Sequence, residues 1–341
     1  MIYMKVILIT GGAGFIGSNF INYFLRRNKS YIIVNYDNLN YSGNMKNLRE
    51  IERSPRYHFV KGSICNQDLV NYVIMRHRPD YIINFACETS AQRSIMNPAP
   101  FFETNVMGTL TLLDSARHFW SKHNYEGNRF IQVSTDEVYG SDSKDSYFTE
   151  DSAIMPRNPF TVSKASSDML VKSFYDNFGF PAVISRCCTN YGPYQHIESF
   201  IPSCIRNAIQ NNRILINSDE NNTRQEWIHV LDHCTALIKI LFYGRNGETY
   251  NISSGTDAFH VEVARKILKI LGKPEEQIET SFRSDTQEQK HAVNSYKIRN
   301  NLNWGHKYNL DDGLLETVHW YKENRNWWDR DTDQIQLLEN Q

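Results

Sequence analysis

The chain has 341 residues, with 37 Lys or Arg against 38 Asp or Glu, so its formal net charge is −1. A chain this long, 40% of it hydrophobic, can bury a large core, which excludes disordered and miniature disulfide-stapled proteins. Its near-zero charge predicts no general attraction to nucleic acid or to an anionic membrane, so any bound anion must be held locally.

The first half of the chain alternates short β-branched runs with stretches that carry apolar residues at three- and four-residue intervals. Strands that alternate with crossover helices, and that are apolar on both faces, predict a doubly wound parallel α/β sheet. The expected strands are Lys5–Thr10, Tyr31–Tyr36, Tyr57–Lys61, Asp80–Asn84, Arg129–Ser134 and Ala182–Arg186. The expected helices are Gly14–Arg26, Gln67–Arg76, Phe102–Lys122 and Ser163–Phe178.

After about residue 186 the pattern becomes irregular, which predicts a smaller mixed α/β lobe packed closely on the first around a cleft. We expect one domain from residues 1–185 and about 228–252, a second from about 186–227 and 253–330, and a frayed tail at 331–341. The expected elements are helices Phe200–Gln210, Val230–Phe242, Val261–Leu271 and Leu310–Asn324, and strands Ile214–Ile216 and Thr249–Ile252.

The six cysteines have no Cys-x-x-Cys spacing, which predicts reduced thiols, a cytoplasmic location and no metal site. The apolar run Met4–Thr10 is too short to span a bilayer and is followed at once by glycines. Cys187 and Cys188 lie on an apolar strand and are expected in the core.

A glycine-rich turn from Gly11 to Gly17 follows the first strand and opens the first helix. Glycines at 11, 14 and 17 permit a tight turn, the close approach of a pyrophosphate and close packing of helix on strand, while the helix N-terminus supplies amide donors. Asp37 ends the second strand 20 residues after Gly17, where a carboxylate binds an adenosine ribose and repels a 2′-phosphate. The pattern predicts a Rossmann-type dinucleotide site that takes NAD rather than NADP.

The stretch Ser134–Gly140, with sequence Ser-Thr-Asp-Glu-Val-Tyr-Gly, ends the fifth predicted strand. Strand carboxyl ends face the ligand crevice in this architecture, so a hydroxyl and two acids would meet the reacting ligand. Two adjacent acids repel each other's ionised forms, so one can stay protonated as a general acid while the other acts as a base.

Further motifs occur throughout residues 4–325. They are Tyr36–Leu39 with Tyr41, Phe85–Glu88, Arg93–Ile95, Thr104-Asn105, Ser163–Asp168, Asn190–Tyr194, Val230 with Asp232-His233, and Gly247–Ile252. With these motifs the chain resembles the extended short-chain dehydrogenase/reductase superfamily and, within it, the nucleotide-sugar 4,6-dehydratases. The Thr-Asp-Glu motif is specific to the dehydratases, whereas the glycine motif is common to the superfamily.

This resemblance implies a lyase that acts on a nucleotide-diphosphate hexose, such as dTDP-glucose or a UDP-sugar. NAD would take a hydride from carbon 4, water would leave from carbons 5 and 6, and the hydride would return to carbon 6 to give a 4-keto-6-deoxy sugar. By the match, Thr135 would bind the oxygen on carbon 4, Asp136 would protonate the departing hydroxyl and Glu137 would remove the carbon 5 proton. Lys164 would hold the nicotinamide ribose.

The resemblance also implies binding residues and a homodimer formed through the helix Phe102–Lys122 and the helix that bears Lys164. The expected cofactor residues are Gly11, Gly14, Phe15, Ile16, Gly17, Asp37, Asn38, Ser63, Ile64, Phe85, Ala86 and Lys164. The expected substrate residues are Glu88, Thr135, Asn190, Arg224 and Lys290.

Phe160 departs from the family pattern, because the superfamily has a tyrosine four residues before the lysine. That phenolate takes the alcohol proton as the hydride leaves, a role worth typically about 10²–10⁴-fold, and a phenyl ring cannot perform it. The phenylalanine can be an engineered trap or the mark of an inactive relative. Alternatively, Tyr139, Cys87 or a water serves as base, or the substrate needs less help at carbon 4; the intact Thr-Asp-Glu set favours these two alternatives.

A substrate with a 5,6 double bond would need less help, because its carbon 4 alcohol is allylic and its oxidation gives a conjugated enone directly. Such a step resembles the conversion of UDP-6-deoxy-GlcNAc-5,6-ene into UDP-4-keto-6-deoxy-L-AltNAc on a route to pseudaminic acid. A sensor that binds the sugar nucleotide or NAD without catalysis is the alternative from another class. An epimerase is disfavoured, because Asp136 and Glu137 would have no elimination to perform.

The substrate lobe departs from the family pattern as well. The arginine before the family's Trp-x-x-Val-x-Asp stretch is Gln225 here, with Arg224 adjacent, and Lys290 is the candidate cation in a later stretch. For Arg224 and Lys290 a surface charge is as good an explanation as substrate contact, whereas Asn190, near a strand end, favours substrate contact. The nucleotide base and the carbon 2 substituent therefore stay open.

Overall fold

The computed structural model describes residues 4–140, 147–217, 223–280 and 289–328. Its centre is a seven-stranded sheet in the order β10-β6-β5-β4-β1-β2-β3, in which every pairing is parallel. The strands are β1 (Lys5–Thr10), β2 (Tyr31–Asp37), β3 (Tyr57–Lys61), β4 (Tyr81–Asn84), β5 (Arg129–Thr135), β6 (Ala182–Cys187) and β10 (Thr249–Ile252). The predicted doubly wound α/β fold is confirmed.

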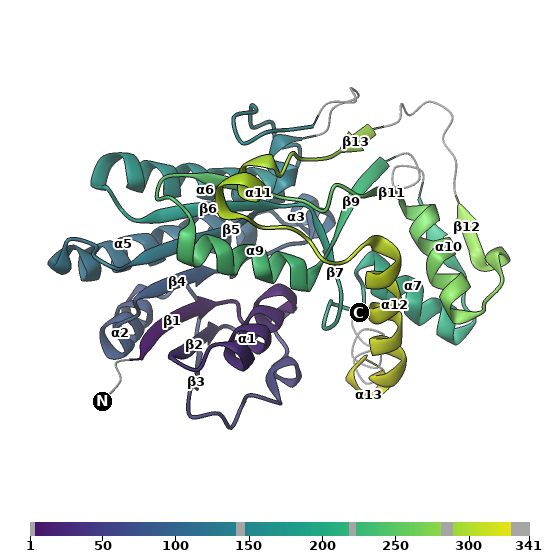
Figure 1. Cartoon of the computed structure of the whole chain (residues 1–341), viewed down its shortest axis with the longest axis horizontal. Helices are drawn as coiled ribbons and strands as arrows, with labels where there is room; N and C mark the ends of the chain where they lie inside the picture. The colour runs from purple at the N-terminus through teal and green to yellow at the C-terminus, as the bar shows by residue number, and fades with distance from the viewer. Residues whose placement is uncertain (1–3, 141–146, 218–222, 281–288, 329–341) are drawn as a thin grey trace.

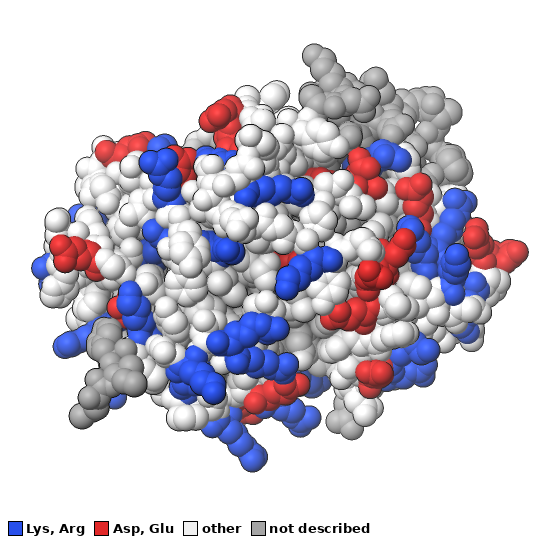
Figure 2. Space-filling view, viewed as in Figure 1, with Lys and Arg blue, Asp and Glu red and all other residues white. Residues whose placement is uncertain are grey.

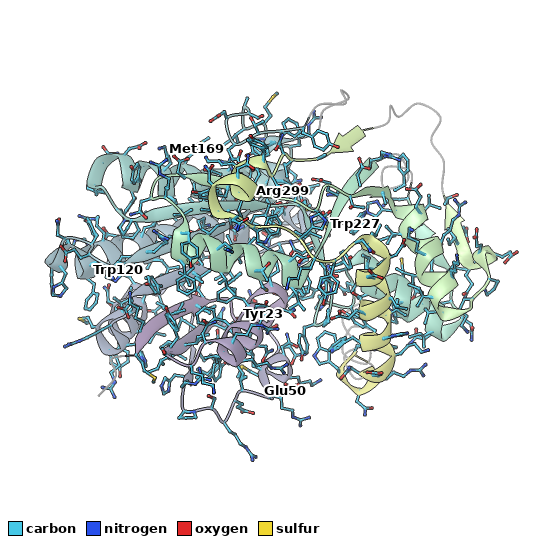
Figure 3. The ribbon with its side chains drawn as sticks, in the orientation of Figure 1. Tyr23, Glu50, Trp120, Met169, Trp227 and Arg299 are labelled. Carbon is cyan, nitrogen blue, oxygen red and sulfur yellow. The ribbon has the colours of Figure 1, made fainter. Side chains whose placement is uncertain are left out.

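Helices cover both faces of this sheet (Figure 1). One face carries α1 (Phe15–Arg27) and α9 (Val230–Tyr243), and the other carries α2 (Gln67–His77), α5 (Thr109–Trp120) and α6 (Pro159–Phe178). Side chains fill both layers: at the far end of this lobe the Trp120 ring stacks on Phe180 with centroids 5.5 Å apart (Figure 3).

The helix α6 begins earlier than its apolar pattern indicates, at Pro159 instead of Ser163. Asn158 caps it, because its side chain accepts from the Thr161 amide at 2.9 Å and the Thr161 hydroxyl pairs with the Asn158 amide in return. Pro159 occupies the first helical position, where no amide hydrogen is needed. Phe160 therefore lies in the first turn of the helix rather than in a loop.

The predicted helix Phe102–Lys122 is helical throughout but changes its geometry along its length. It comprises the end of α4 (Ala99–Phe102), the wide π-helical turn η2 (Glu103–Gly108), α5, and the start of the 3-10 turn η3 (Ser121–His123). The Asn105 side chain uses this turn to bind both backbone groups of Glu88, accepting from its amide at 2.8 Å and donating to its carbonyl at 3.1 Å. The turn thus holds the segment after β4 against α6.

The second lobe is built around β9 (Thr223–His229), a strand that the sequence pattern did not reveal. It pairs with β7 (Thr189–Tyr191), β11 (Asp257–Phe259) and β13 (Gln289–His291), and a separate pair joins β8 (Ile214–Ile216) to β12 (Ile278–Thr280). The lobe also contains the predicted helices, observed as α7 (Phe200–Gln210), α10 (His260–Leu271) and α12 (Leu310–Glu323). They enclose a second apolar core around Trp227 (Figure 3).

Short helices connect these elements. They are η1 (Met45–Leu48), α3 (Ala91–Met96), η4 (Asp136–Tyr139), η5 (Glu275–Gln277), α11 (Tyr296–Leu302) and α13 (Arg325–Trp328). The predicted tail at 331–341 lies outside the described residues, and the predicted domain boundaries stay a prediction. On the face shown in Figure 2, acidic and basic side chains are interspersed. Among the described residues, no helix combines the length and apolar character needed to cross a membrane.

Glu226 joins segments that are distant in the sequence. Its carboxylate is fully buried, and it accepts from the Ser253 hydroxyl at 2.5 Å and from the Val293 amide at 3.0 Å. Burial raises the pKa of Glu226 to about 7, although both hydrogen bonds oppose this shift. The strand β9 is thus held to the chain after β10 and after β13 by a carboxyl group that titrates near neutrality.

Glu226→Gln tests this linkage. A carboxyl whose pKa is raised from 4.5 to about 7 on folding stabilises the protein fully below its unfolded pKa, and this contribution is lost as the pH rises through 7. The shift corresponds to on the order of 3 kcal/mol. We expect the unfolding free energy of the wild type to fall relative to that of the variant between about pH 5 and 7, measured by urea denaturation; parallel pH curves would contradict this.

Candidate active site

A cavity of about 410 Å³ lies at the carboxyl ends of the parallel strands. The parallel register brings these ends to one edge, because Thr10 of β1 pairs with Tyr36 of β2 and Asn84 of β4, and Thr135 of β5 pairs with Cys187 of β6. Each strand therefore passes its next residues into the same space. Residues from the second lobe, among them Gln195 and His196, complete the wall.

The glycine turn forms one end of this cavity. Gly11 has φ +67°, and a Cβ there would lie 2.6 Å from the Ala86 amide nitrogen, so only glycine fits. A Cβ at Gly17 would lie 2.5 Å from the Gly11 carbonyl oxygen. The two glycines therefore let the turn pack against the residues after β4 and let α1 pack against the turn. At the N-terminus of α1, which lines the cavity, amide groups and the helix dipole favour an anion.

Asp37 lies at the end of β2 in the same wall. Its two carboxylate oxygens accept from the Ala13 amide and the Leu39 amide, each at 2.8 Å, which fixes the orientation of the group. Burial raises the pKa of Asp37, and the two amides oppose this. Every predicted cofactor residue lines the cavity, so the structure brings the whole predicted set together.

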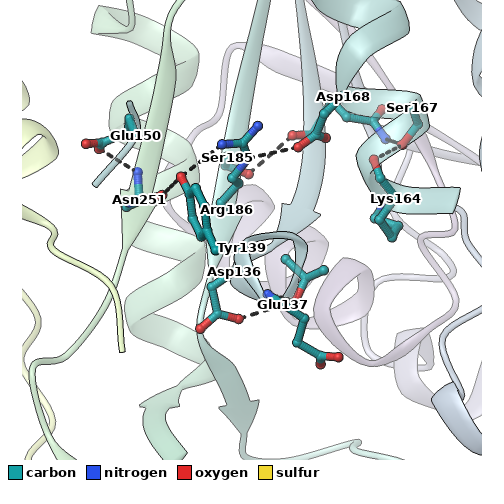
Figure 4. A network of polar contacts seen from close by, with 12 residues as sticks. Asp136, Glu137, Tyr139, Glu150, Lys164, Ser167, Asp168, Ser185, Arg186 and Asn251 are labelled. Atoms are coloured by element: carbon teal, nitrogen blue, oxygen red, sulfur yellow. Dashed lines mark hydrogen bonds and ion pairs between the residues drawn. The ribbon is translucent and has the colours of Figure 1, made fainter. Parts of the chain in front are cut away.

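The opposite end of the cavity holds the predicted reacting groups. Thr135, Glu137, Phe160 and Lys164 line it, whereas Asp136 is buried directly behind Thr135, whose hydroxyl lies 3.3 Å from the Asp136 carboxylate. The Lys164 ammonium donates to the Val133 carbonyl at 2.7 Å. Figure 4 shows Asp136 and Glu137 on the short helix η4, close to α6.

The two acids differ in their electrostatic surroundings. Burial, reinforced by the charges of Glu137 and Glu226, raises the pKa of Asp136 well above its usual value. Burial alone raises the pKa of Glu137. Asp136 is therefore the acid that holds its proton more strongly, and Glu137 is the one that ionises first, which separates an acid role from a base role.

Phe160 lies in the cavity wall with its side chain 6% exposed. Its ring meets the edge of Phe101 with centroids 6.4 Å apart, and its amide donates to the Ser94 hydroxyl at 3.1 Å. The ring occupies the position expected for the missing phenol, so the structure places an apolar surface there.

Of the two side chains considered as replacement bases, only Cys87 lines the cavity. Tyr139 lies behind it: its hydroxyl donates to Asn251 at 2.8 Å and accepts from Arg186 at 2.9 Å, and its ring stacks on Phe148 (Figure 4). Tyr139 therefore belongs to a buried network that supports η4. Cys87 is partly buried, and burial raises the pKa of its thiol although the charge of Lys164 opposes this.

The predicted substrate residues are not all brought together. Asn190 lines the cavity, where its amide group donates to the Cys188 carbonyl and its oxygen lies 2.9 Å from His233 Nδ1. Glu88 accepts from Asn40 at 2.5 Å beside the cavity wall. Arg224 forms an ion pair with Asp257 at 3.0 Å and is not among the residues that line the described cavity.

Alternation along β9 explains this placement, because Gln225, not Arg224, donates to the cavity residue Thr189 at 2.6 Å. The side chain of Lys290 lies outside the described part of the structure.

Sequence reasoning missed several wall residues. Cys187 and Cys188 are buried in the main core, as expected, but both also line the cavity. The position of Cys187 at the end of β6 indicates a place in the wall, because the carboxyl ends of the neighbouring parallel strands face the ligand as well. His233 belongs to the motif at Val230 and Asp232-His233, but sequence reasoning did not place this motif in the wall. His196 belongs to no motif and reaches the wall only through the packing of the second lobe.

The comparisons with known proteins agree with this geometry. A family model described as GDP-mannose 4,6 dehydratase matches residues 8–317. The dTDP-glucose 4,6-dehydratase of Streptomyces niveus is 39% identical, over 95% of this chain and 94% of that protein. The low-salt glycan biosynthesis protein Agl12 of Haloferax volcanii is 41% identical, over 92% of this chain and 98% of that protein.

Solved structures give the same result. The dTDP-glucose 4,6-dehydratase of Bacillus anthracis, crystallised with NAD, superposes with a TM-score of 0.87 at 40% identity, covering 96% of this chain and 99% of that one. The dTDP-glucose 4,6-dehydratase DesIV of Streptomyces venezuelae reaches 0.88 at 35% identity with coverage of 96% and 99%. The chain therefore belongs to the GDP-mannose 4,6 dehydratase family, within the extended short-chain dehydrogenases/reductases that its motifs resemble.

Proposed function

We propose that this protein is an NAD-dependent nucleotide-sugar 4,6-dehydratase, which converts a nucleotide-diphosphate hexose into its 4-keto-6-deoxy derivative. The observation that carries the proposal is one cavity that has the Gly11–Gly17 turn and Asp37 at one end and Thr135, Glu137 and Lys164 at the other. The glycine turn and Asp37 would hold the adenosine end of a dinucleotide, and Lys164 would hold its nicotinamide ribose at the end that carries Thr135 and Glu137. The similarity to dTDP-glucose 4,6-dehydratases over nearly the whole chain supports the same reading.

The residues of the chain fit NAD. The glycine turn and the N-terminus of α1 line the cavity and offer amide groups to a pyrophosphate, Asp37 is held to accept ribose hydroxyls, and its charge opposes a 2′-phosphate. When bound, NAD accepts a hydride from carbon 4 of the sugar and later returns it to carbon 6. The ammonium of Lys164, buried at the same end, is placed to hold the ribose and to supply positive charge.

The acids of η4 divide the elimination between them. Asp136, whose pKa is raised well above its usual value, keeps a proton to give to the departing carbon 6 hydroxyl. Glu137, which ionises first and lines the cavity, takes the carbon 5 proton. Thr135 holds the oxygen on carbon 4. Its Oγ1 accepts from the Glu137 amide at 3.2 Å and donates to the Asp136 carboxylate at 3.3 Å, so its hydroxyl turns from Asp136 to that oxygen when the sugar binds. Asn190 contributes to the sugar-diphosphate side.

Phe160 favours a second candidate function. With an apolar ring in place of the phenol, the chain lacks the usual acceptor for the carbon 4 proton, and an allylic alcohol needs that acceptor less. The candidate is the conversion of UDP-6-deoxy-GlcNAc-5,6-ene into UDP-4-keto-6-deoxy-L-AltNAc, in which Asp136 or Glu137 acts as proton donor. For a saturated substrate, a water in the cavity takes the proton instead, because the raised pKa of Cys87 keeps its thiol neutral.

We also infer a homodimer and a cytoplasmic location. Phe102, Met107 and Met169 are exposed large apolar side chains on α4, η2 and α6, the segments expected to pair. All six cysteines are unpaired, which suits a reducing compartment. A monomeric mass in analytical ultracentrifugation at micromolar concentration would contradict the dimer.

A column of side chains joins the two lobes at the edge of the cavity, where Tyr41 lies between the wall residues Asn40 and Ser42 and His196 is itself a wall residue. The Arg93 guanidinium lies 4.3 Å from the centroid of the Tyr41 ring, and the Tyr41 ring lies 4.7 Å from that of His196. Tyr41 follows β2 in the cofactor lobe, whereas His196 precedes α7 in the second lobe. We infer that this column retains NAD between turnovers, as a cycle that regenerates its own cofactor requires.

Phe160→Tyr tests the proposed reaction. We expect the variant to turn over dTDP-glucose, UDP-glucose or UDP-GlcNAc about 10²–10⁴-fold faster than the wild type, because the phenol supplies the missing base. The wild type should act on at least one of these sugars or on the 5,6-ene, measured by formation of the 4-keto product. The double variant Phe160→Tyr/Lys164→Met controls for the base, since without the ammonium the phenol pKa is not lowered and the gain should vanish. If Phe160→Tyr is no faster on any sugar, the phenylalanine does not limit the reaction.

Tyr41→Ala tests retention of the cofactor. Loss of the stacking contacts, worth about 1–2 kcal/mol, should speed the release of NAD about tenfold. Release is followed in a stopped-flow instrument by the change in fluorescence when protein that holds fluorescently labelled NAD is diluted into excess unlabelled NAD. Tyr72→Ala, which removes an exposed tyrosine on α2 away from the cavity, is the matched control. Equal release rates for wild type and Tyr41→Ala would sink the retention role.

A further inference from the structure

Two neighbouring thiols lie in the wall of the cofactor cavity. Cys187 is the last residue of β6 and pairs in register with Thr135, and Cys188 follows it with its amide bound to the Ile252 carbonyl at 3.1 Å. Both side chains are buried, with 4% and 1% of their surface exposed, yet both line the cavity. They are adjacent in sequence, share one wall and are not disulfide-bonded.

Asn190 and His233 hold this pair in place. The Asn190 amide group donates both to Cys187 Sγ at 3.3 Å and to the Cys188 carbonyl at 2.9 Å. The Asn190 oxygen meets His233 Nδ1 at 2.9 Å, and His233 is fully buried in the same wall. Within the described chain, Nε2 of His233 has no hydrogen-bond partner, so this atom can bind a small polar ligand beside the thiols.

The two thiols have opposite electrostatic character. Burial disfavours the Cys187 thiolate, but the hydrogen bond from Cys188 and the charge of His233 outweigh it and lower the pKa of Cys187. Burial and the neighbouring Cys187 raise the pKa of Cys188. A thiolate beside a neutral thiol is the arrangement of a nucleophilic and a resolving cysteine.

The other cysteines lack this arrangement. Cys87 also lines the cavity, but it has no neighbouring thiol in the sequence, and burial raises its pKa. Cys65 is more exposed, lies outside the cavity wall and donates its thiol to the Glu103 carbonyl; burial raises its pKa too. Reaction controlled by exposure alone would therefore select Cys65 or Cys87, both partly exposed, whereas reaction controlled by the surroundings selects the pair.

We propose that Cys187 and Cys188 form a reversible oxidation site for hydroperoxides, and that its oxidation and the binding of a dinucleotide in the same cavity exclude each other. The inference goes beyond the proposed function and does not depend on turnover. A bound dinucleotide would cover the thiols, and an oxidised Cys187 would project into the space that the dinucleotide fills. Binding and oxidation linked in this way weaken each other reciprocally.

The chemistry balances with the peroxide as oxidant. The Cys187 thiolate attacks one peroxide oxygen, the O–O bond breaks, and the leaving hydroxide takes a proton and departs as water. Cys187 is then a sulfenic acid. The Cys188 sulfur attacks the Cys187 sulfur, the S–O bond breaks, and the hydroxyl departs with the Cys188 proton as a second water. Two thiols are oxidised to one disulfide while one hydrogen peroxide is reduced to two waters.

The test treats the full chain with hydrogen peroxide, with and without NAD, and follows thiol content, peptide mass and NAD binding. Without NAD, we expect the peptide that carries both cysteines to become two hydrogen atoms lighter and to regain its mass with dithiothreitol. NAD at about 100 times its Kd leaves about 1% of the protein unliganded, so oxidation should slow about a hundredfold. The oxidised protein should bind NAD more weakly than the reduced protein, measured by fluorescence titration.

Two variants make the result specific. Cys188→Ser removes the resolving thiol, so oxidation should stop at a sulfenic acid on Cys187 that a dione reagent traps, with no disulfide. Cys65→Ser is the matched control and should respond as the wild type does. If Cys188→Ser does not fold, the mass map of the wild type and the effect of NAD still decide the question.

A disulfide elsewhere, none at all, an oxidation rate unchanged by NAD or an unchanged NAD affinity after oxidation would overturn the proposal. None of these readouts requires turnover, so failure of this proposal and failure of the proposed dehydratase activity are distinguishable.

Discussion

The buried ion pair between Arg186 and Asp168 is the interaction on which the catalytic end of the cavity depends. Arg186 Nε donates to Asp168 at 2.9 Å, and Nη1 donates to the Tyr139 hydroxyl at 2.9 Å, so one guanidinium joins β6, α6 and η4 (Figure 4). Tyr139 continues the network to Asn251 of β10. Removing one partner of such a pair leaves an uncompensated buried charge, which costs about 3–5 kcal/mol. The position of Glu137 relative to Lys164 follows from this network.

A chain of nearly zero net charge can hold two anions because the groups that attract them are concentrated at the cavity. The glycine turn offers amide groups and a helix N-terminus, and Lys164 supplies one buried ammonium, so no broad basic surface is required. The same enclosure raises the pKa values of Asp136 and Glu137 by desolvation. Electrostatic differences of this kind come from depth in the fold, because the two acids are neighbours in the sequence.

Phe160 shows how one missing hydroxyl changes the chemistry without changing the architecture. The capping box at Asn158 and Thr161 still starts α6 one residue before it, and the ring still fills the cavity wall. What changes is the set of groups that can accept the carbon 4 proton, because the phenol is absent from it. The identity of the substrate therefore depends on the chemistry at carbon 4 and not on the fold.

The sequence by itself determined the secondary structure of the first lobe and its dinucleotide-binding motif. Strand and helix periods, the Gly11–Gly17 turn and Asp37 at a strand end are local patterns, and local patterns decide local structure. The resemblance of the motifs placed Thr135, Glu137 and Lys164 in a common site, and the cavity contains all three. Sequence reasoning also anticipated the helices of the second lobe to within a few residues.

Only the tertiary structure decided the rest. The pairing of β9 with three short strands depends on long-range register, which no local period encodes. Packing places Tyr139 in the buried network behind η4 and pairs Arg224 with Asp257. It also brings Cys187, Cys188 and His233 to the cavity wall. Each of these outcomes follows from which face of an element is covered and how deeply it is desolvated, and both are properties of the assembled chain.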